Sequence, residues 1–430
     1  MREDCEINYK DAVFKISTTK QKLKQKEYLH TGEIPVIDQG QDIIGGYTND
    51  KNRILNCELP VIVFGDHTKN VKLIKFPFAP GADGTKVLEP KTYISPSYLY
   101  YVTEVLVFKI KDKGYARHYQ YIEKEKFPLV SVPEQKAIVK KIEELFSSLD
   151  SGIADLKKAQ NQLVIYRQAV LKKAFEGELT KEWREKNDIK REKWNTNKLG
   201  EVLKTIDGDR GKNYPKKHDL LNKGYCLFLS TKNVRQGEFV FKENLFITKE
   251  KDDLLRGGKL ERNDVVLTTR GTLGNVALYD SKINFNNIRI NSGMLILRVN
   301  NQSELSQPFL MQFINSSLFF QQLKAKQSGT AQPQIPARVL REIEIEIPND
   351  IKEQHQIVQE IESRLSVCDT VEKDIADSLE KAQALRQSIL KKAFEGKLLS
   401  EEEITACKQH KDYEPASVLL EKIKAEKKQK

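Results

Sequence analysis

The chain has 430 residues, and 39% of them are hydrophobic, which is enough for two or three domains with buried cores and excludes a disordered protein. No run of 18 apolar residues occurs and the start MREDCEINYK has no signal-peptide pattern, so we expect a cytoplasmic protein without a membrane span. Five cysteines without close pairing indicate reduced thiols rather than disulfides or a zinc cluster, and the net charge of +11 favours a polyanionic partner.

Residues 1–130 carry short β-rich runs such as Leu59–Phe64 between Gly, Asn and Asp turns, which predicts a compact α+β domain. Three of its polar loops hold the residue types that read base edges, namely Gly65–Lys69, Gly81–Lys86 and Tyr115–Tyr119. The candidate DNA contacts in this domain are His67, Thr68, Lys69, Lys86, Arg117 and His118. Such loops are also the usual form of ordinary turns, and that interpretation stays open.

An apolar residue recurs every seven residues along residues 131–180, which predicts a long helix with a coiled-coil seam. This row consists of Ile142, Leu149, Leu156, Leu163 and Val170. Ser131 and Glu134 have the spacing of a capping box at the start of the helix, and Gly177 is placed to take the left-handed conformation just past its end. From Glu134 to Phe175 such a helix would run about 60 Å at roughly 1.5 Å per residue.

Residues 181–348 form a linker and a second region of the same texture, where runs such as Val265–Leu267 and Met294–Leu297 again predict an α+β domain. Its polar loops supply a second set of candidate DNA contacts. These are Lys232, Asn233, Arg235, Arg270, Thr272, Asn275, Arg289, Asn291, Thr330 and Gln332. Arg270 is the first choice for a bidentate contact to a base, and a salt bridge that braces a turn is the alternative role.

Residues 349–398 repeat the first helix. VLKKAFEGEL at Val170–Leu179 returns as ILKKAFEGKL at Ile389–Leu398, and about 19 of some 46 positions are identical at a shift of about 219 residues. Pairing the helices buries both seams, so we expect an antiparallel coiled coil with pseudo-twofold symmetry. Its helix-pairing residues are Ile142, Leu149, Leu156, Leu163, Ile361, Ile375 and Ile389.

Ordinary core packing is the alternative origin of such a heptad stripe, but the duplication of the caps and of the length favours the coiled coil. Residues 399–430 read as a basic C-terminal tail. We expect its segment Glu414–Lys424 to pack against the first domain and complete it. The fold class predicted for the chain is therefore α+β, with two domains of short strands and helices joined by two long helices.

The order of these parts resembles the specificity subunit of type I restriction-modification systems over almost the whole chain. The motifs that carry the likeness are VFKIS, GEIPVIDQGQ, FGDHT and GADGTKVL in the first region, LGEVL, STKNV, TTRGTLGNVA and QPQIP in the second, and the two helices with LKKAFEGEL and LKKAFEGKL. The resemblance implies two target-recognition domains, and helices that dock two methyltransferase subunits, which restriction and translocase subunits then join. One departure is that the first region lacks the tryptophan-led opening seen at Trp194.

We expect no catalysis by this chain alone, because it has no Gly-rich phosphate loop, no amino-methylation motif and no metal-ligand cluster. His67 next to Asp66 would suit acid–base chemistry, but no partner constellation recurs near it, so we expect a hydrogen bond to a base or to its own loop. The resemblance places S-adenosylmethionine, ATP and Mg²⁺ in the partner subunits, which would methylate adenine and cut DNA, and leaves no cofactor on this chain.

Two unlike domains on a stiff spacer predict that the chain reads double-stranded DNA at a bipartite, asymmetric site. Three alternatives stay open: a structural coiled-coil adaptor, an orphan specificity protein without restriction activity, and a self-contained nuclease or methyltransferase with a divergent motif. Alanine at Arg270 and Lys232 discriminates the first of these, because an adaptor would keep its site preference in those variants. Turnover by the purified chain would establish the last.

Overall fold

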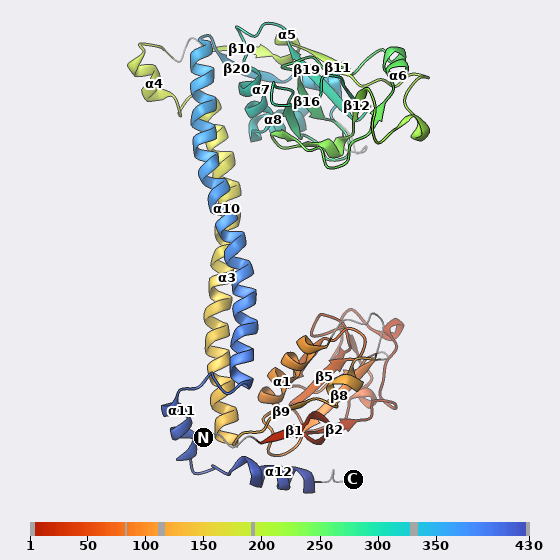
Figure 1. Cartoon of the computed structure of the whole chain (residues 1–430), viewed down its shortest axis with the longest axis vertical. Coiled ribbons are helices and arrows are strands. Elements are labelled where there is room, and N and C mark those ends of the chain that lie inside the picture. Colours follow the sequence, from red (N-terminus) through yellow and green to blue (C-terminus); the bar gives the residue numbers. More distant parts are fainter. Residues whose placement is uncertain (1–4, 82–83, 111–116, 191–193, 327–333, 427–430) are drawn as a thin grey trace. The chain divides into compact units, whose positions relative to one another are not determined.

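The computed structural model describes residues 5–81, 84–110, 117–190, 194–326 and 334–426. The chain divides into two compact units, unit 1 made of residues 1–156 and 376–430 and unit 2 made of residues 157–375. Two long helices, α3 (Val132–Phe175) and α10 (Ile351–Phe394), each contribute a part to both units (Figure 1). None of the helices within the described ranges is long and apolar enough to span a bilayer.

The described residues of unit 1 form three small sheets and, besides the long helices, four α-helices. Its strands are β1 (Glu6–Asn8), β2 (Val13–Ile16), β3 (Ile34–Ile37), β4 (Gly46–Thr48), β5 (Val61–Gly65), β6 (Val71–Ile74), β7 (Ala79–Pro80), β8 (Thr85–Pro90) and β9 (Lys126–Pro128). Its helices are α1 (Pro96–Lys109), α2 (Tyr119–Ile122), α11 (Glu401–Lys408) and α12 (Ala416–Ala425). The sheets have the strand orders β2-β8-β5-β6, β4-β3-β7 and β1-β9, and every pair is antiparallel except β3 with β7.

Unit 2 repeats this sheet topology strand for strand. Its strands are β10 (Trp194–Lys198), β11 (Leu203–Asp207), β12 (Cys226–Leu229), β13 (Val234–Arg235), β14 (Glu238–Phe239), β15 (Phe246–Ile247), β16 (Val265–Thr268), β17 (Val276–Leu278), β18 (Ile288–Ile290), β19 (Met294–Val299) and β20 (Glu344–Pro348). Its helices are α4 (Lys181–Lys186), α5 (Leu199–Val202), α6 (Lys249–Leu254), α7 (Gln307–Ile314), α8 (Ser317–Lys326) and α9 (Ala337–Arg341). The orders β11-β19-β16-β17, β15-β12-β18 and β10-β20 match those of unit 1, the one parallel pair is again in the three-stranded sheet, and the hairpin β13-β14 is additional.

The strands β5 and β16 of the four-stranded sheets are buried on both faces, which explains their uninterrupted apolar runs. In unit 1, Ile62 and Phe64 of β5 face α1 and the long helices, whereas Val61 and Val63 face the three-stranded sheet. Unit 2 divides its strands in the same way between two clusters of buried side chains. Successive residues of a strand point to opposite faces, so each strand serves two cores at once. The predicted α+β fold class is confirmed.

The long helices begin and end with the predicted signals. Ser131 Oγ accepts a hydrogen bond from the backbone N–H of Glu134, and Asp350 accepts one from the N–H of Lys352. At the other ends Gly177 and Gly396 have φ values of 78° and 75°, in the left-handed region that lets the chain turn off the helix. At the start of α10 the carboxylate of Glu353 is bound by Thr180, Arg184 and Trp194.

The packing of α3 on α10 uses repeat-related contacts in each unit. Arg386 donates to Asp150 at 2.8 Å in unit 1, and Arg167 donates to Asp369 at 2.7 Å in unit 2. The shift that relates the two copies of the helix converts one pair into the other. Because each pair joins an early residue of one helix to a late residue of the other, the helices run antiparallel, as predicted.

The predicted helix-pairing residues are largely withdrawn from solvent. Ile142, Ile361, Ile375 and Ile389 are buried, whereas Leu149, Leu156 and Leu163 are half-buried. The C-terminal helix α12 also joins the core of unit 1, because Leu419 and Ile423 are buried in the same cluster as Tyr98 of α1. The Nζ of Lys91 donates to the carbonyl of Ile423 at 2.7 Å, which ties this helix to the end of β8. The expectation that the tail packs against the first domain is confirmed.

One glutamine at the start of each long helix fixes the domain to it. Gln135 accepts a hydrogen bond from the N–H of Ser95, the N-cap of α1, and donates to the carbonyl of Tyr93. Gln354 makes the same two bonds in unit 2, to the N–H of Ser306 and the carbonyl of Glu304. Both amides also donate to a carbonyl just before their own helix. Each unit therefore orients its sheet domain on the helix pair by the same local contacts.

Candidate nucleic-acid interface

Three connections of unit 1 meet at one end of its sheets. They are the segment after β3 with Gln39, the β5–β6 turn from Asp66 to Asn70, and the segment between β7 and β8 with Gly84. Thr68 Oγ1 donates to the carbonyl of Gln39 at 2.6 Å, and Asn70 Nδ2 donates to the same oxygen at 3.0 Å. The N–H of Asp66 donates to the carbonyl of Gly84 at 2.7 Å. These bonds tie the β5–β6 turn to both neighbouring connections.

Glycine is required at position 84 for two reasons. Its φ is +91°, and a Cβ there would lie 2.7 Å from Gln39 Oε1 and 2.8 Å from His67 Cδ2. We therefore expect Gly84→Ala to displace the β5–β6 turn and to weaken binding to the DNA half-site predicted for unit 1, at a cost of about 1–3 kcal/mol for the strained backbone. The check is a binding titration with the matching duplex, with Gly152→Ala as control because a Cβ at Gly152 meets nothing within 4 Å. An unchanged affinity for that half-site would contradict the expectation.

The candidate residues of unit 1 differ in accessibility. Thr68 and Arg117 are exposed, and His67, Lys69 and Lys86 are half-buried. Lys86 Nζ lies 3.4 Å from a carboxylate oxygen of Asp66, which holds this cation beside the turn. The side chain at position 118 is fully buried, and its ring Nδ1 lies 2.9 Å from the carbonyl of Asp66. This burial opposes a direct contact between His118 and a base, and gives the ring the role of supporting the turn from inside.

Unit 2 assembles the equivalent three connections. The turn between β16 and β17 contains Arg270, and the N–H groups of Thr269 and Arg270 donate to the carbonyl of Gly293 at 2.8 and 3.2 Å. This carbonyl corresponds to that of Gly84 in unit 1, because Gly84 directly precedes β8 and Gly293 directly precedes β19, the counterpart of β8. The segment after β12 also approaches, since a Cβ at Gly293 would lie 3.1 Å from Thr231 Cγ2. Both units thus bring the same three connections together, although their sequences differ.

Four candidates of unit 2 have exposed side chains. These are Lys232, Arg235, Arg270 and Thr272. Lys232 makes an ion pair with Glu243 at 3.2 Å, but both side chains are about three-quarters exposed, so the pair contributes little and can be exchanged for a phosphate. Arg235 donates to the carbonyl of Val234 at 3.0 Å. The side chain of Arg270 forms no hydrogen bond or ion pair with any other described residue. The salt bridge that was the alternative role of Arg270 is therefore not formed among those residues.

Other predicted contacts serve the interior of the domain. Asn233 is buried, accepts from the N–H of Ser230 and donates to the carbonyls of Val240 and Glu243. Asn275 donates to the carbonyl of Val234, and Asn291 accepts from the N–H of Gly293. These amides shape the connections rather than present free base-reading edges. Thr330 and Gln332 lie outside the described residues, as do Ala82, Asp83, Tyr115 and Ala116 of the candidate loops in the first domain.

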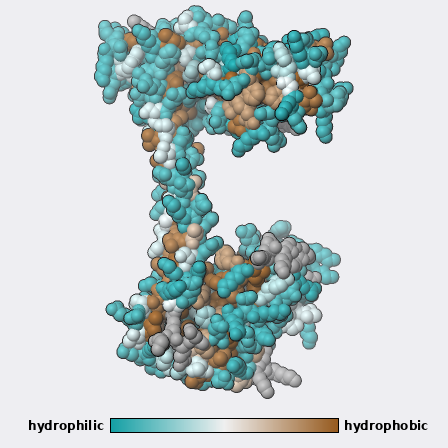
Figure 2. Space-filling view, in the orientation of Figure 1, coloured by the Kyte–Doolittle hydropathy of each residue, from teal (hydrophilic) through white to brown (hydrophobic). Residues whose placement is uncertain are grey.

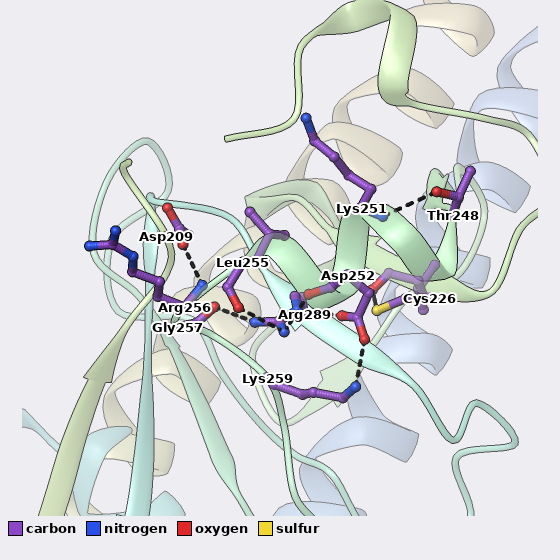
Figure 3. Close-up of polar contacts among 11 residues, drawn as sticks. Asp209, Cys226, Thr248, Lys251, Asp252, Leu255, Arg256, Gly257, Lys259 and Arg289 are labelled. Atoms are coloured by element: carbon purple, nitrogen blue, oxygen red, sulfur yellow. Dashed lines mark hydrogen bonds and ion pairs between the residues drawn. The ribbon is translucent and has the colours of Figure 1, made fainter. Parts of the chain in front are cut away.

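Arg289 is also buried, in a polar cluster that joins β18 to α6 and to the segment after it (Figure 3). Its Nε donates to Asp252, its Nη1 to the carbonyl of Gly257 at 2.7 Å, and its Nη2 to the carbonyls of Asp252 and Leu255. Lys259 Nζ donates to the other carboxylate oxygen of Asp252 at 2.5 Å. These bonds occupy the guanidinium on every side, which opposes the predicted contact between Arg289 and DNA.

Charges in this cluster set the protonation of its members. Burial acts to raise the pKa of Asp252, but hydrogen bonds from Lys259 and Arg289 outweigh it and hold that pKa below its usual value. Burial, together with the negative charge of Asp252, raises the pKa of the Cys226 thiol to about 12. Asp252 is therefore ionised and Cys226 is a neutral thiol, and the cluster has the character of a structural ion pair.

The sequence interpretation missed Gln39. This residue lies in the quoted motif GEIPVIDQGQ, and its carbonyl and amide oxygens organise the turn with His67, Thr68 and Asn70. A polar residue directly after a predicted buried strand was the available signal. Its importance depends on contacts across about 30 residues of chain, which local patterns do not report.

Comparison with known proteins identifies relatives of this architecture. Residues 191–381 match the family model described as type I restriction modification DNA specificity domain. The chain is 29% identical over 318 residues to the type I restriction enzyme EcoBI specificity subunit of Escherichia coli, covering 70% of this chain but only 64% of that protein. It is 27% identical to the EcoDI specificity subunit of Escherichia coli, over 80% of this chain and 79% of the relative. The StySPI specificity subunit of Salmonella potsdam is also 27% identical, over 79% and 73%.

Solved structures share the fold at low sequence identity. The HsdS subunit from Thermoanaerobacter tengcongensis superposes with a TM-score of 0.53 at 17% identity, covering 91% of this chain and 97% of that one. A chain from a study of complex assembly and conformational transition in a type I R-M system superposes with a TM-score of 0.68 at 16% identity, covering 91% and 98%. At these identities the likeness concerns the fold.

Proposed function

We propose that this chain, which is a relative of the specificity subunits of type I restriction enzymes, selects the DNA sequence on which a restriction-modification complex acts. The observation that carries the proposal is a repetition. Both units have the same sheet topology and bring the same three connections together, but the side chains on those connections differ between the units. Equal scaffolds with unequal loops suit two unlike half-sites, so the site is bipartite and asymmetric. The helices α3 and α10 have 44 residues each, about 66 Å at 1.5 Å per residue, and set the unread gap.

The partners in this proposal are two methyltransferase subunits together with restriction and translocase subunits. Apolar side chains lie among the polar ones on the surface of the long helices (Figure 2), which supports docking of a protein there. Val164, Ile165 and Val367 of these helices are 61%, 69% and 62% exposed. The Arg–Asp pair between the helices recurs in each unit, so this helix–helix contact is duplicated, which suits two copies of one partner. S-adenosylmethionine, ATP and Mg²⁺ belong to those partners, and this chain itself is non-catalytic and cytoplasmic.

The test is adenine methylation mapping of DNA from cells that express this chain with its methyltransferase subunits, compared with cells that lack the chain. We expect a two-part motif with a fixed gap that is methylated only when the chain is present. A soluble complex with an active methyltransferase and no new motif would instead favour an adaptor.

Replacement of Arg270 by alanine is expected to relax the sequence requirement in one half-site and to leave the other half-site unchanged. The exposed guanidinium of Arg270 extends from the β16–β17 turn without a partner among the described residues, and a bidentate contact to a base discriminates by about 1–3 kcal/mol. The measurement is the methylated motif of the variant, read at every position of both half-sites.

A matched control is Lys282→Ala, an exposed cation that follows β17 at the other end of the same sheet. It should keep both half-sites intact. A motif that is identical in Arg270→Ala and in the wild-type chain would remove Arg270 from the set of base-reading residues. A motif that degrades equally in both half-sites would point to a general loss of folding.

A further inference from the structure

Unit 2 carries a basic loop that none of the candidate contacts includes. This second basic loop, Gly208–Lys217, follows β11 and contains Arg210, Lys212, Lys216 and Lys217, all exposed. It lies beside the base-reading connections, because a Cβ at Gly208 would lie 2.2 Å from the carbonyl oxygen of Asn291. The guanidinium of Arg210 also donates to the carbonyl of Ser292 at 3.4 Å. The next residue is Gly293, whose carbonyl binds the β16–β17 turn.

Asp209 fixes this loop without neutralising its cations. Its carboxylate accepts the backbone N–H of Gly211 at 2.6 Å and that of Arg256 at 2.7 Å (Figure 3). Burial acts to raise the pKa of Asp209, but the N–H groups of Arg256, Gly211 and Gly257 outweigh it and hold that pKa below its usual value. The single acidic residue of the loop is thus directed at the backbone, while the side chain of Arg256 is exposed next to it.

Unit 1 places a basic loop at the equivalent position. This first basic loop, Ser17–Lys26, follows β2, the counterpart of β11, and contains four lysines and no acidic residue. Lys20, Lys24 and Lys26 are exposed. The N–H of Leu23 donates to the carbonyl of Pro80 at 3.0 Å, which holds the loop beside the connection that leads to Gly84.

The two basic loops also end alike. Each leads into a short 3-10 helix, Gln25–Glu27 or Lys217–Asp219. The last residue of each 3-10 helix is acidic, and its carboxylate accepts a hydrogen bond from the backbone N–H of the lysine that directly precedes the helix. This lysine is Lys24 in unit 1, at 2.7 Å, and Lys216 in unit 2, at 2.8 Å. This recurrence on two scaffolds with little loop sequence in common indicates a shared task rather than a chance run of charge.

Few of these cations are engaged within the protein. Arg210 makes an ion pair with Asp207 at 3.0 Å, but both side chains are about half exposed, so the pair is weak. In the part of the chain that the structure describes, the side chains of Lys20, Lys24, Lys26, Lys212, Lys216 and Lys217 form no ion pair. Exposed, unpaired cations next to base-reading turns fit the phosphate groups that flank the bases read.

Resting on the proposed function, we propose that the two basic loops are phosphate clamps, one in each unit, that hold the DNA backbone beside the half-site read by the neighbouring turns. The clamps contribute affinity and register and carry no sequence information. Each lysine or arginine that neutralises a phosphate releases condensed counterions, so its removal lowers the salt dependence of binding by a defined amount.

The test compares the full chain, in complex with its methyltransferase subunits, with two variants. One is Arg210→Gln/Lys212→Gln/Lys216→Gln, and the other is Lys20→Gln/Lys24→Gln/Lys26→Gln. Binding to a duplex with the mapped motif and to a scrambled duplex is titrated at several salt concentrations. For each variant we expect the slope of log K against log salt to fall by about 2–3, and the affinity at low salt to fall roughly 10- to 100-fold on both duplexes. The methylated motif should stay unchanged.

The control variant Lys10→Gln/Lys75→Gln/Lys282→Gln removes the same charge from the opposite ends of the strands. It should leave the slope unchanged, and an equal loss of slope there would overturn the proposal in favour of net charge alone. An unchanged slope of log K against log salt in both clamp variants would also overturn the proposal. A relaxed sequence requirement in one half-site of the methylated motif would overturn it too, because the loops would then read bases. If the wild-type complex bound the motif duplex and the scrambled duplex equally, the proposed recognition function would be refuted. The salt dependence of the clamp variants would still decide whether the two loops bind phosphates.

Discussion

Replacing Asp252 with alanine is expected to lower the free energy of unfolding of unit 2 by about 3–5 kcal/mol, because the change leaves the buried guanidinium of Arg289 without its counterion. The measurement is chemical denaturation combined with hydrogen exchange of peptides from β18 and α6, which localises the loss to this unit. The neighbour Asp253 is exposed, so Asp253→Ala is the matched control and should change stability by less than about 0.5 kcal/mol.

The double variant Asp252→Ala/Arg289→Met separates the ion pair from simple packing. Removing both charges leaves no uncompensated guanidinium, so much of the lost stability should return. The pair also predicts a pH dependence, because the folded-state pKa of Asp252 is lowered. Its contribution is present above the unfolded-state pKa of about 3.9 and is lost as the pH falls through the lower folded value. Equal stability of Asp252→Ala and the wild type at neutral pH would contradict the role assigned to this pair.

Glu353→Ala is expected to have an effect of similar size at the start of α10. The carboxylate of Glu353 is 1% exposed and accepts hydrogen bonds from Arg184 at 2.7 Å, Thr180 at 3.0 Å and the indole of Trp194 at 3.0 Å. Arg184 also donates to the carbonyl of Gly177. One carboxylate therefore joins the end of α3, α4, β10 and α10, and its removal leaves a buried arginine unpaired, which costs about 3–5 kcal/mol.

Limited proteolysis between α3 and β10 measures this effect directly, because that segment would lose its anchor. The control is Glu362→Ala, an exposed carboxylate two turns further along α10, which should leave the cleavage rate unchanged. If Glu353→Ala and Glu362→Ala were cleaved equally slowly, the junction would have to be held by the apolar contacts of Trp194 and Phe175 instead.

Local and periodic signals predicted much of the fold. The caps at Ser131 and Asp350, the left-handed glycines and the heptad seam depend on residues within one or two turns, and the duplication supplied each signal twice. The internal symmetry of the sheets was not predictable, because the strands of units 1 and 2 share topology and burial but little sequence.

The candidate site was predicted at the level of loops and less well at the level of residues. Arg270 and Arg289 are the same residue type and both were predicted to contact DNA, yet one is exposed and the other is buried. The difference arises from Asp252, which lies 37 residues away in the sequence and is brought to β18 by the fold. Burial of His118 has the same kind of origin, through contacts with Asp66. The basic loops were missed because lysines in a turn have no periodicity that separates a phosphate contact from a solvated surface.

Under the proposed recognition function, the glutamine joints of the long helices bear on how a new DNA specificity would arise. Gln135 and Gln354 each recognise a serine N–H and the carbonyl two residues before that serine, which are backbone features of the incoming domain. Because these bonds go to backbone groups, they do not depend on which side chains the loops at the far end of the sheets carry. Gene exchange that alters those loops, and keeps the glutamine joints and the side chains that bind Glu353, would therefore change the target sequence in a single event without disturbing the docking of the domain.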